Sequence, residues 1–303
     1  MAEEKRKNTT YKTEWSFSFA ELGDRISEFV QSLGVAGDEE AIKTERFTEI
    51  VGNAAAARVR LDTPVGETAV YAATDDALID AEITHVGEID FAVIGDTEKD
   101  VTLSQRSAAA DWVRGIAGWF GSGGKLRWNV ALTPNIPLEL DIYSGVGRSV
   151  YSLSQMQLTK LEIHGGTGEM EVHLPQTDSI LPAVINGGIG EIEVNVPPNS
   201  NIDLQLRAGT GEIELRIGEN TAMNAVIKGG VGETEIRVAP GAAVRLEARI
   251  GLGNINVPSS FIQVSGSRSA IGGKGVWQSP NYETATRQIN IRYDGGIGEL
   301  KIR

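Results

Sequence analysis

Pairs of glycines in the pattern G-x-G return at nearly constant intervals along much of this 303-residue chain, which contains 36 glycines. The second glycines of successive pairs lie 21 to 23 residues apart. They are Gly147, Gly168, Gly190, Gly211, Gly232, Gly253, Gly275 and Gly298. Upstream, Gly66 and Gly87 are also 21 residues apart. The distance from Gly87 to Gly147 is 60 residues, nearly three periods, which predicts one insertion between them. So narrow a spread indicates an internal repeat of one structural unit.

Each repeat predicts two short β-strands that meet at the glycine pair. Residues 204–207 read LQLR and residues 212–217 read EIELRI, so apolar and polar residues alternate on both sides of Gly211. A period of two is typical of a strand that is buried on one face. Glycine at the bend allows a positive φ and a close approach of the neighbouring unit.

Two all-β architectures fit two strands per 21 residues. In a β-solenoid (β-helix or β-roll), equivalent residues of successive units stack in register about 4.8 Å apart. In an antiparallel meander or sandwich, each unit is a hairpin and neighbouring units alternate in direction. The constant unit length favours a single-stranded β-solenoid with rungs of about 21 residues, because stacked rungs constrain one another's length.

Several segments carry a family resemblance. Residues 128–140 read WNVALTPNIPLEL, and SGVG, LTKLEI, GGTG and VHLP follow within residues 144–175. These segments resemble the toastrack-type domain, a bacterial β-solenoid found at the C-terminus of LiaF-like cell-envelope stress proteins. The likeness covers about residues 58–303 and implies a solenoid fold with a role in envelope stress. Such relatives typically carry membrane helices before the solenoid, which this sequence lacks.

The chain before the solenoid predicts a short helical element. Residues 1–13 are polar and predict a disordered tail, and residues 14–57 form a helical element and a lead-in to the first strands. Ser18 and Glu21 have the spacing of a capping box. The apolar residues up to Leu33 follow a helical period, so the helix is expected to cover the end or side of the solenoid, with partner binding as the alternative.

The insertion, at about residues 104–125, predicts a second helix. One side of this helix carries Trp112, Ile116, Trp119 and Phe120. Large aromatic side chains pack on the protein's own core, on another chain or at a membrane interface. The segment has no cationic face, so packing on the solenoid is the first expectation, a contact between chains or with a partner the second, and lipid the third.

Stacked rungs turn the glutamates after each bend into an acidic row. Its members are Glu169, Glu191, Glu212 and Glu233, and a second row follows two residues later. Like charges this close raise one another's pKa unless cations intervene. The expected cations precede the bends or follow the second row: His164, Arg207, Lys228, Arg249, Arg216 and Arg237. The rows predict a solvated, partly ion-paired face, with divalent cations or a basic partner as alternatives.

Composition and spacing argue against several functions. The net charge of -13 repels a phosphate backbone, so nucleic acid is not an expected partner. No cysteine is present, which excludes disulfides and thiolate chemistry. The carboxylates repeat evenly, whereas a catalytic pair would stand out in one or two rungs. We therefore expect no catalytic, cofactor or metal site, with a carbohydrate-active β-helix enzyme as a remote alternative.

The last residues suggest how the protein interacts. Residues 295–303 end within a regular rung, which predicts an uncapped end whose interacting residues include Leu300 and Ile302. A homo-oligomer, an end-to-end assembly or a docked partner would cover it. No signal peptide or spanning segment is apparent, so a cytoplasmic location is expected. The sequence thus predicts a non-enzymatic, self-associating or partner-docking scaffold, with an adhesin-like sensor that contacts membranes through residues 112–120 as the alternative.

Overall fold

A computed structural model describes residues 42–106, 126–268 and 272–303. Sixteen strands form one sheet, and one 3-10 turn spans Tyr282–Thr284. The strands are β1 (Ile42–Ile50), β2 (Ala56–Val65), β3 (Glu67–Ala72), β4 (Ala77–Val86), β5 (Glu88–Ile94), β6 (Glu98–Arg106), β7 (Arg127–Leu132), β8 (Pro137–Ser152), β9 (Gln157–His173), β10 (Leu181–Val196), β11 (Asn201–Ile217), β12 (Ala222–Val238), β13 (Val244–Asn256), β14 (Ile262–Arg268), β15 (Gly273–Gln278) and β16 (Ile289–Ile302).

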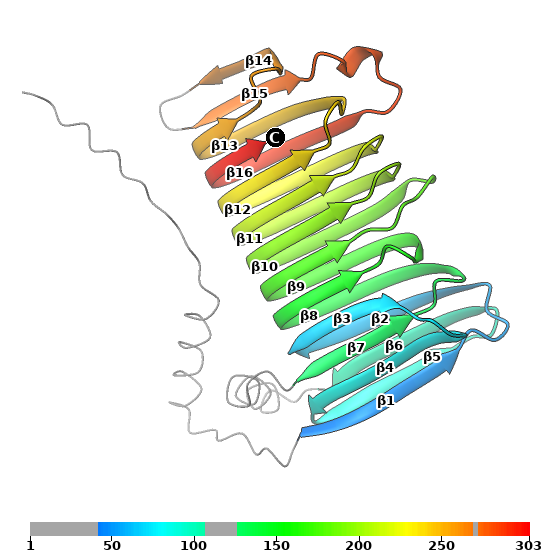
Figure 1. The fold of residues 1–303 in the computed structure, drawn as a ribbon. Helices are drawn as coiled ribbons and strands as arrows, with labels where there is room; N and C mark the ends of the chain where they lie inside the picture. Colours follow the sequence, from blue (N-terminus) through cyan, green and yellow to red (C-terminus); the bar gives the residue numbers. More distant parts are fainter. Residues whose placement is uncertain (1–41, 107–125, 269–271) are drawn as a thin grey trace, which may run out of the picture.

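The centre of the molecule is a stack of five parallel rungs in chain order, β8 to β12 (Figure 1). Each rung is one long strand that bends at its G-x-G pair and returns. We call the part before the bend the first limb and the part after it the second limb. The expected β-solenoid is therefore confirmed, and each rung is continuous through the bend rather than broken into two strands.

Apolar and polar residues alternate along each rung, and the apolar side chains form the core between the two limbs. In β11, Leu204 and Leu206 of the first limb and Ile213 and Leu215 of the second are buried, while the residues between them face outward. The parallel register repeats this pattern one rung away, so every inward position becomes a continuous apolar row. Burial of these rows is the main stabilising contribution to the stack.

The bend glycines form a row of close backbone contacts. Seven of them have φ between 133° and 149°, a region that side chains rarely adopt. They are Gly147, Gly168, Gly190, Gly211, Gly232, Gly298 and Gly253, in the order in which their rungs stack. A Cβ on any of them would meet the carbonyl oxygen of the corresponding glycine one rung away. The repeat therefore requires glycine at this position for both conformation and space.

Gly275 does not belong to this row, so its assignment as a bend glycine is wrong. It is buried in β15, opposite Ala248 of β13 and Gly266 of β14 in antiparallel pairs. A Cβ there would meet the indole ring of Trp277. Gly275 is thus required for packing under a tryptophan, and the 22-residue interval before it does not mark a further rung.

The order of rungs differs from the chain order at the N-terminal end of the stack. The rung formed by β2 and β3 lies between the rung formed by β6 and β7 and strand β8. Strands β4 and β5 pair antiparallel with β7 and β6, and β1 adds antiparallel to β4. The sheet thus already begins at Ile42, within the expected lead-in. The insertion separates β6 from β7, at the place in the rung where other rungs have their bend.

The order also changes at the C-terminal end. Strand β16, red in Figure 1, lies between β12 and β13 and is parallel to both. Strand β15 pairs antiparallel with β13, and β14 is the last strand of the path. The expectation of an uncapped C-terminal rung is therefore wrong. Leu300 and Ile302 are 0% and 3% exposed and belong to the core rather than to an interaction surface.

Two expected elements lie outside the described residues. One is the helix from about Ser18 to Leu33, and the other is the helical insertion that carries Trp112, Ile116, Trp119 and Phe120. Both stay predictions.

Candidate interaction surfaces

The glutamates that follow the bends form one row on the outer face of the second limb. Glu169, Glu191 and Glu212 are neighbours in the parallel register, Glu233 continues the row, and Glu299 of β16 is in register with Glu233. Arg148 Nε lies 3.5 Å from a Glu169 carboxylate oxygen. Lys301 Nζ lies 2.6 Å from Glu233 and 3.1 Å from Glu299.

The middle of this acidic row is less well neutralised than its ends. Among the described residues, the Glu191 and Glu212 side chains have neither an ion pair nor a hydrogen bond, and both are exposed. Partial desolvation beside the bend raises the pKa of Glu191 above its usual value, and the carboxylates of Glu212 and Glu169 raise it further. These two carboxylates are therefore available to a cation brought by another molecule.

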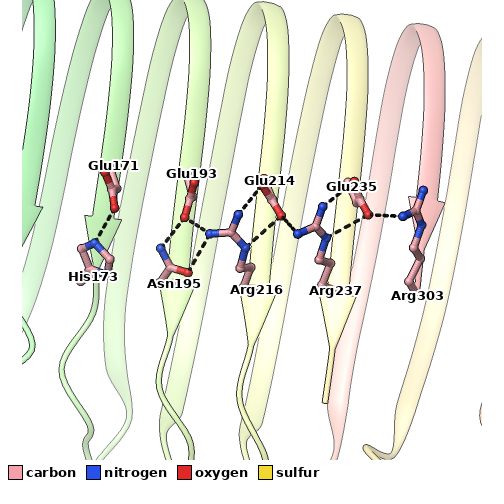
Figure 2. Close-up of polar contacts among 9 residues, drawn as sticks. All are labelled: Glu171, His173, Glu193, Asn195, Glu214, Arg216, Glu235, Arg237 and Arg303. Carbon is pink, nitrogen blue, oxygen red and sulfur yellow. Dashed lines mark hydrogen bonds and ion pairs between the residues drawn. The ribbon is translucent and has the colours of Figure 1, made fainter. Parts of the chain in front are cut away.

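The second glutamate row forms an ion ladder with the residues two positions further along each strand (Figure 2). The ladder consists of Glu171 with His173, Glu193 with Asn195, Glu214 with Arg216, and Glu235 with Arg237, and Arg303 closes it. Arg216 donates to Glu214 at 2.9 and 2.7 Å on its own rung and also contacts Glu193 on the preceding one. Arg237 likewise contacts Glu214 at 2.7 Å. The ladder ties adjacent rungs together along the outer face.

The other expected cations do not neutralise the acidic rows. They occupy the outer face of the first limb, where Tyr143, His164, Asn186, Arg207 and Lys228 form one row. His164 stacks on the Tyr143 ring with centroids 4.8 Å apart, and Arg207 donates to Gln205 at 3.4 Å. Arg249 pairs with Asp294, at 2.5 and 3.1 Å. Only Arg216 and Arg237 act as predicted; the rest lie across the bend from the glutamates.

An exposed apolar ridge runs along the bends between these two faces. It is formed by the residue between the two glycines of each pair: Val146, Thr167, Ile189, Thr210, Val231, Ile297 and Leu252, in stacking order. Ile189, Val231, Ile297 and Leu252 are 44% to 50% exposed. The sequence analysis missed this ridge, although an apolar residue inside a glycine pair at an exposed bend was the available signal.

A second apolar feature is the sheet edge at β14. Within the described chain, β14 pairs only with β15, so one side of its backbone has no strand partner. Its Ile262 and Val264 side chains are half exposed. An unpaired strand with exposed β-branched residues is a template for pairing with another chain. The exposed end on this side of the sheet is therefore β14, and not residues 295–303 as the sequence predicted.

The space behind the bends is small. A cavity of about 20 Å³ lies between the limbs of β8 to β10, lined largely by glycines and threonines and bordered by Glu169 and Glu191. That volume holds about one water molecule, which is far below what a substrate needs. Within residues 42–106, 126–268 and 272–303, no three potential metal ligands come together. In the part of the chain that the structure describes, no helix is long and apolar enough to cross a bilayer.

These features define a class of protein: a flattened parallel β-solenoid whose rungs bend at G-x-G pairs. Residues 34–195, more than half of the chain, match the family model for the N-terminal domain of toast_rack, DUF2154. The chain therefore belongs to the toast_rack family, as the sequence resemblance indicated. No curated protein matches the sequence.

Solved structures of similar proteins come from bacteria. A candidate cell adhesion protein from Clostridium sporogenes is 18% identical with a TM-score of 0.40, covering 86% of this chain and 99% of that one. A candidate adhesin from Bacteroides fragilis is 12% identical with a TM-score of 0.38, covering 89% of this chain and 100% of that one.

Proposed function

We propose that this protein is a non-enzymatic scaffold that self-associates through the sheet edge at β14. The observation that carries the proposal is the unpaired side of β14, with Ile262 and Val264 half exposed beside it. Two copies of one strand can pair antiparallel around a two-fold axis, which gives a closed dimer with the same residues on both sides. Such pairing would satisfy the free backbone groups and cover both apolar side chains.

The rest of the surface supports a scaffold rather than a catalyst. The core is packed by apolar rows, and the outer faces carry charges that repeat from rung to rung instead of converging on one point. Catalytic sites place unlike groups around a pocket that holds the substrate. A regular charged face suits contacts with another extended surface.

Cysteine cross-linking tests this association in a chain that has no cysteine of its own. In Val264→Cys, a strand pair across the two-fold axis brings the two thiols of a dimer near each other, so oxidation should give a covalent dimer rapidly. Val226→Cys is the matched control, because Val226 is also exposed but lies in β12, whose backbone is paired on both sides. Val264→Cys cross-linking no faster than Val226→Cys would refute the proposal.

Three further expectations stay predictions. Membership in the toast_rack family is compatible with a role in a cell-envelope stress response, which deletion of the gene under envelope stress would test. Cell fractionation would test the predicted cytoplasmic location. Contact of residues 112–120 with lipid, as in an adhesin-like sensor, would be tested by liposome sedimentation of the Trp112→Ala, Trp119→Ala double variant.

A further inference from the structure

The bend edge carries three parallel stripes that differ in chemistry. The apolar ridge runs along the middle, with Ile189 and Val231 exposed on it. Arg207 and Lys228 lie on the first-limb side of the ridge. Glu191 and Glu212 lie on the second-limb side. An exposed apolar strip with polar margins has the anatomy of a protein interface.

The charged stripes have few partners within the molecule. In the described chain, the Arg207 side chain has one hydrogen bond, to the Gln205 amide oxygen at 3.4 Å. Lys228 has no ion pair there, and its neighbour in register on β16 is Asp294. Glu191 and Glu212 are likewise without cations, as described above. Exposed cations and exposed carboxylates thus face outward from opposite margins of one ridge.

We propose that this edge binds the same edge of a second copy, around a two-fold axis parallel to the stack. That rotation keeps the direction of the stack, so each rung faces the same rung of the other copy. It also places the first limb of one copy opposite the second limb of the other. Arg207 of one copy then meets Glu212 of the other, and the reverse contact forms on the far side of the axis. The ridges meet between them, with Val231 against Val231.

The alternative two-fold axis, perpendicular to the stack, would bring the basic stripe onto the basic stripe. Like charges placed opposite each other disfavour association. Around Arg207 and Glu212 the charge pattern therefore favours the parallel arrangement and a second copy over an unrelated partner. On the rung of β16, Asp294 would face Glu299, and these two carboxylates are neutralised within each copy by Arg249 and Lys301. The bend edge is a different surface from the β14 edge, so the two contacts are independent.

The size of the edge predicts weak association. Seven rungs span roughly 30 Å, and the limbs are about 10 Å apart, so each copy contributes a few hundred Å². Stable dimers bury about 800 Å² per partner. We expect a dissociation constant of roughly 10 to 100 µM that increases with salt, because the charged contacts lie at the exposed margins.

The test uses full-length protein in which Ile262→Lys and Val264→Lys block the β14 edge. Sedimentation velocity at 5 to 200 µM should show a monomer–dimer equilibrium in this parent protein. Arg207→Glu alone and Glu212→Arg alone should each raise the dissociation constant about tenfold. The double variant Arg207→Glu, Glu212→Arg should return it to within about twofold of the parent, because the exchanged charges again face each other.

Asp203→Lys is the matched control, since Asp203 is exposed on the first limb of the same strand but lies away from the bend. It should leave the dissociation constant unchanged. Circular dichroism of each variant should match the parent. A parent that stays monomeric at 200 µM in low salt, or single variants that weaken association without rescue by the double variant, would overturn the inference. Neither result bears on the β14 contact, which cross-linking tests separately.

Discussion

At the residue scale, the bend glycines do more than permit a turn. Each has a positive φ, and each lies where a Cβ would meet a backbone carbonyl of the next rung. Backbone cannot move aside as a flexible side chain can, so a substitution should force rungs apart locally. Backbone conformation and the close approach of the next rung are therefore two requirements for glycine at one position.

Gly211→Ala and Gly241→Ala compare a crowded bend glycine with a glycine in open space. Both glycines have positive φ, 133° at Gly211 and 79° at Gly241, and the larger value is the less accessible to alanine. The Gly241 site has nothing within 4 Å of an added Cβ, whereas at Gly211 the carbonyl of Gly190 is in the way. We expect Gly241→Ala to cost about 1 to 2 kcal/mol in the free energy of unfolding. Gly211→Ala should cost about 2 kcal/mol more. Urea denaturation measures both, and equal costs would show that the rungs do not stack this closely.

Glu191 gives a pH dependence of defined sign. Its pKa is raised in the folded protein, so the native state binds a proton more readily than the unfolded state and stability decreases as pH rises above 4.5. Glu191→Gln should therefore stabilise the protein at pH 7, by at most about 0.5 kcal/mol because the carboxylate is exposed. The gain should vanish below pH 4.5. Asp203→Asn is the control, and a stabilisation independent of pH would contradict this explanation.

At the scale of the strands, the ion ladder shows which electrostatic contacts link rungs. Arg216 is 39% exposed and bridges Glu193 and Glu214, which belong to neighbouring strands. Exposed ion pairs contribute little individually, whereas a network that separates stacked carboxylates contributes more. The ladder therefore adds to the register that the apolar rows already set, and its contribution should depend on salt.

Arg216→Met tests the ladder. We expect a loss of about 0.5 to 1 kcal/mol in the free energy of unfolding at low ionic strength, since Glu193 would then lie beside Glu214 without the cation that links them. Arg237 still contacts Glu214, which limits the loss. The loss should shrink in 1 M NaCl, where exposed charges are screened. Arg207→Met, on the other limb of β11, has no ladder contact and should show no such salt dependence in dilute protein. A salt-independent loss for Arg216→Met would indicate lost packing instead.

At the scale of the whole molecule, the sequence predicted the middle of the stack well and its ends poorly. The glycine period and the alternation around Gly211 correctly predicted parallel rungs from β8 to β12. The glutamate rows followed from the same register. The period could not reveal the spatial order of the rungs. Strand β16 has the same residue pattern as β12, so its sequence would allow it to pair with any of the rungs.

The antiparallel strands at both ends also carry glycines at the spacing of the period, Gly87 between β4 and β5 and Gly275 in β15, so the period does not reveal their direction. These strands decide which rungs become internal. Strand β15 covers the first limb of β13, and β4 and β5 cover the rung of β6 and β7. Reversed strands break the parallel register that would otherwise allow endless stacking. Gly275 was misassigned for this reason, since its spacing imitates a bend while its strand runs the other way.

The order of β12, β16 and β13 is the most direct test of this fold. Asn224 and Asn290 are adjacent in register, and their side chains are hydrogen-bonded at 3.2 Å, whereas Arg245 lies one rung beyond Asn290. Paired cysteines at 224 and 290 would have Cα atoms roughly 5 Å apart and should form an intramolecular disulfide, while cysteines at 224 and 245, roughly 10 Å apart, should not. Peptide mapping that finds the first disulfide alone would support the tucked position of β16; a disulfide between 224 and 245 would contradict it.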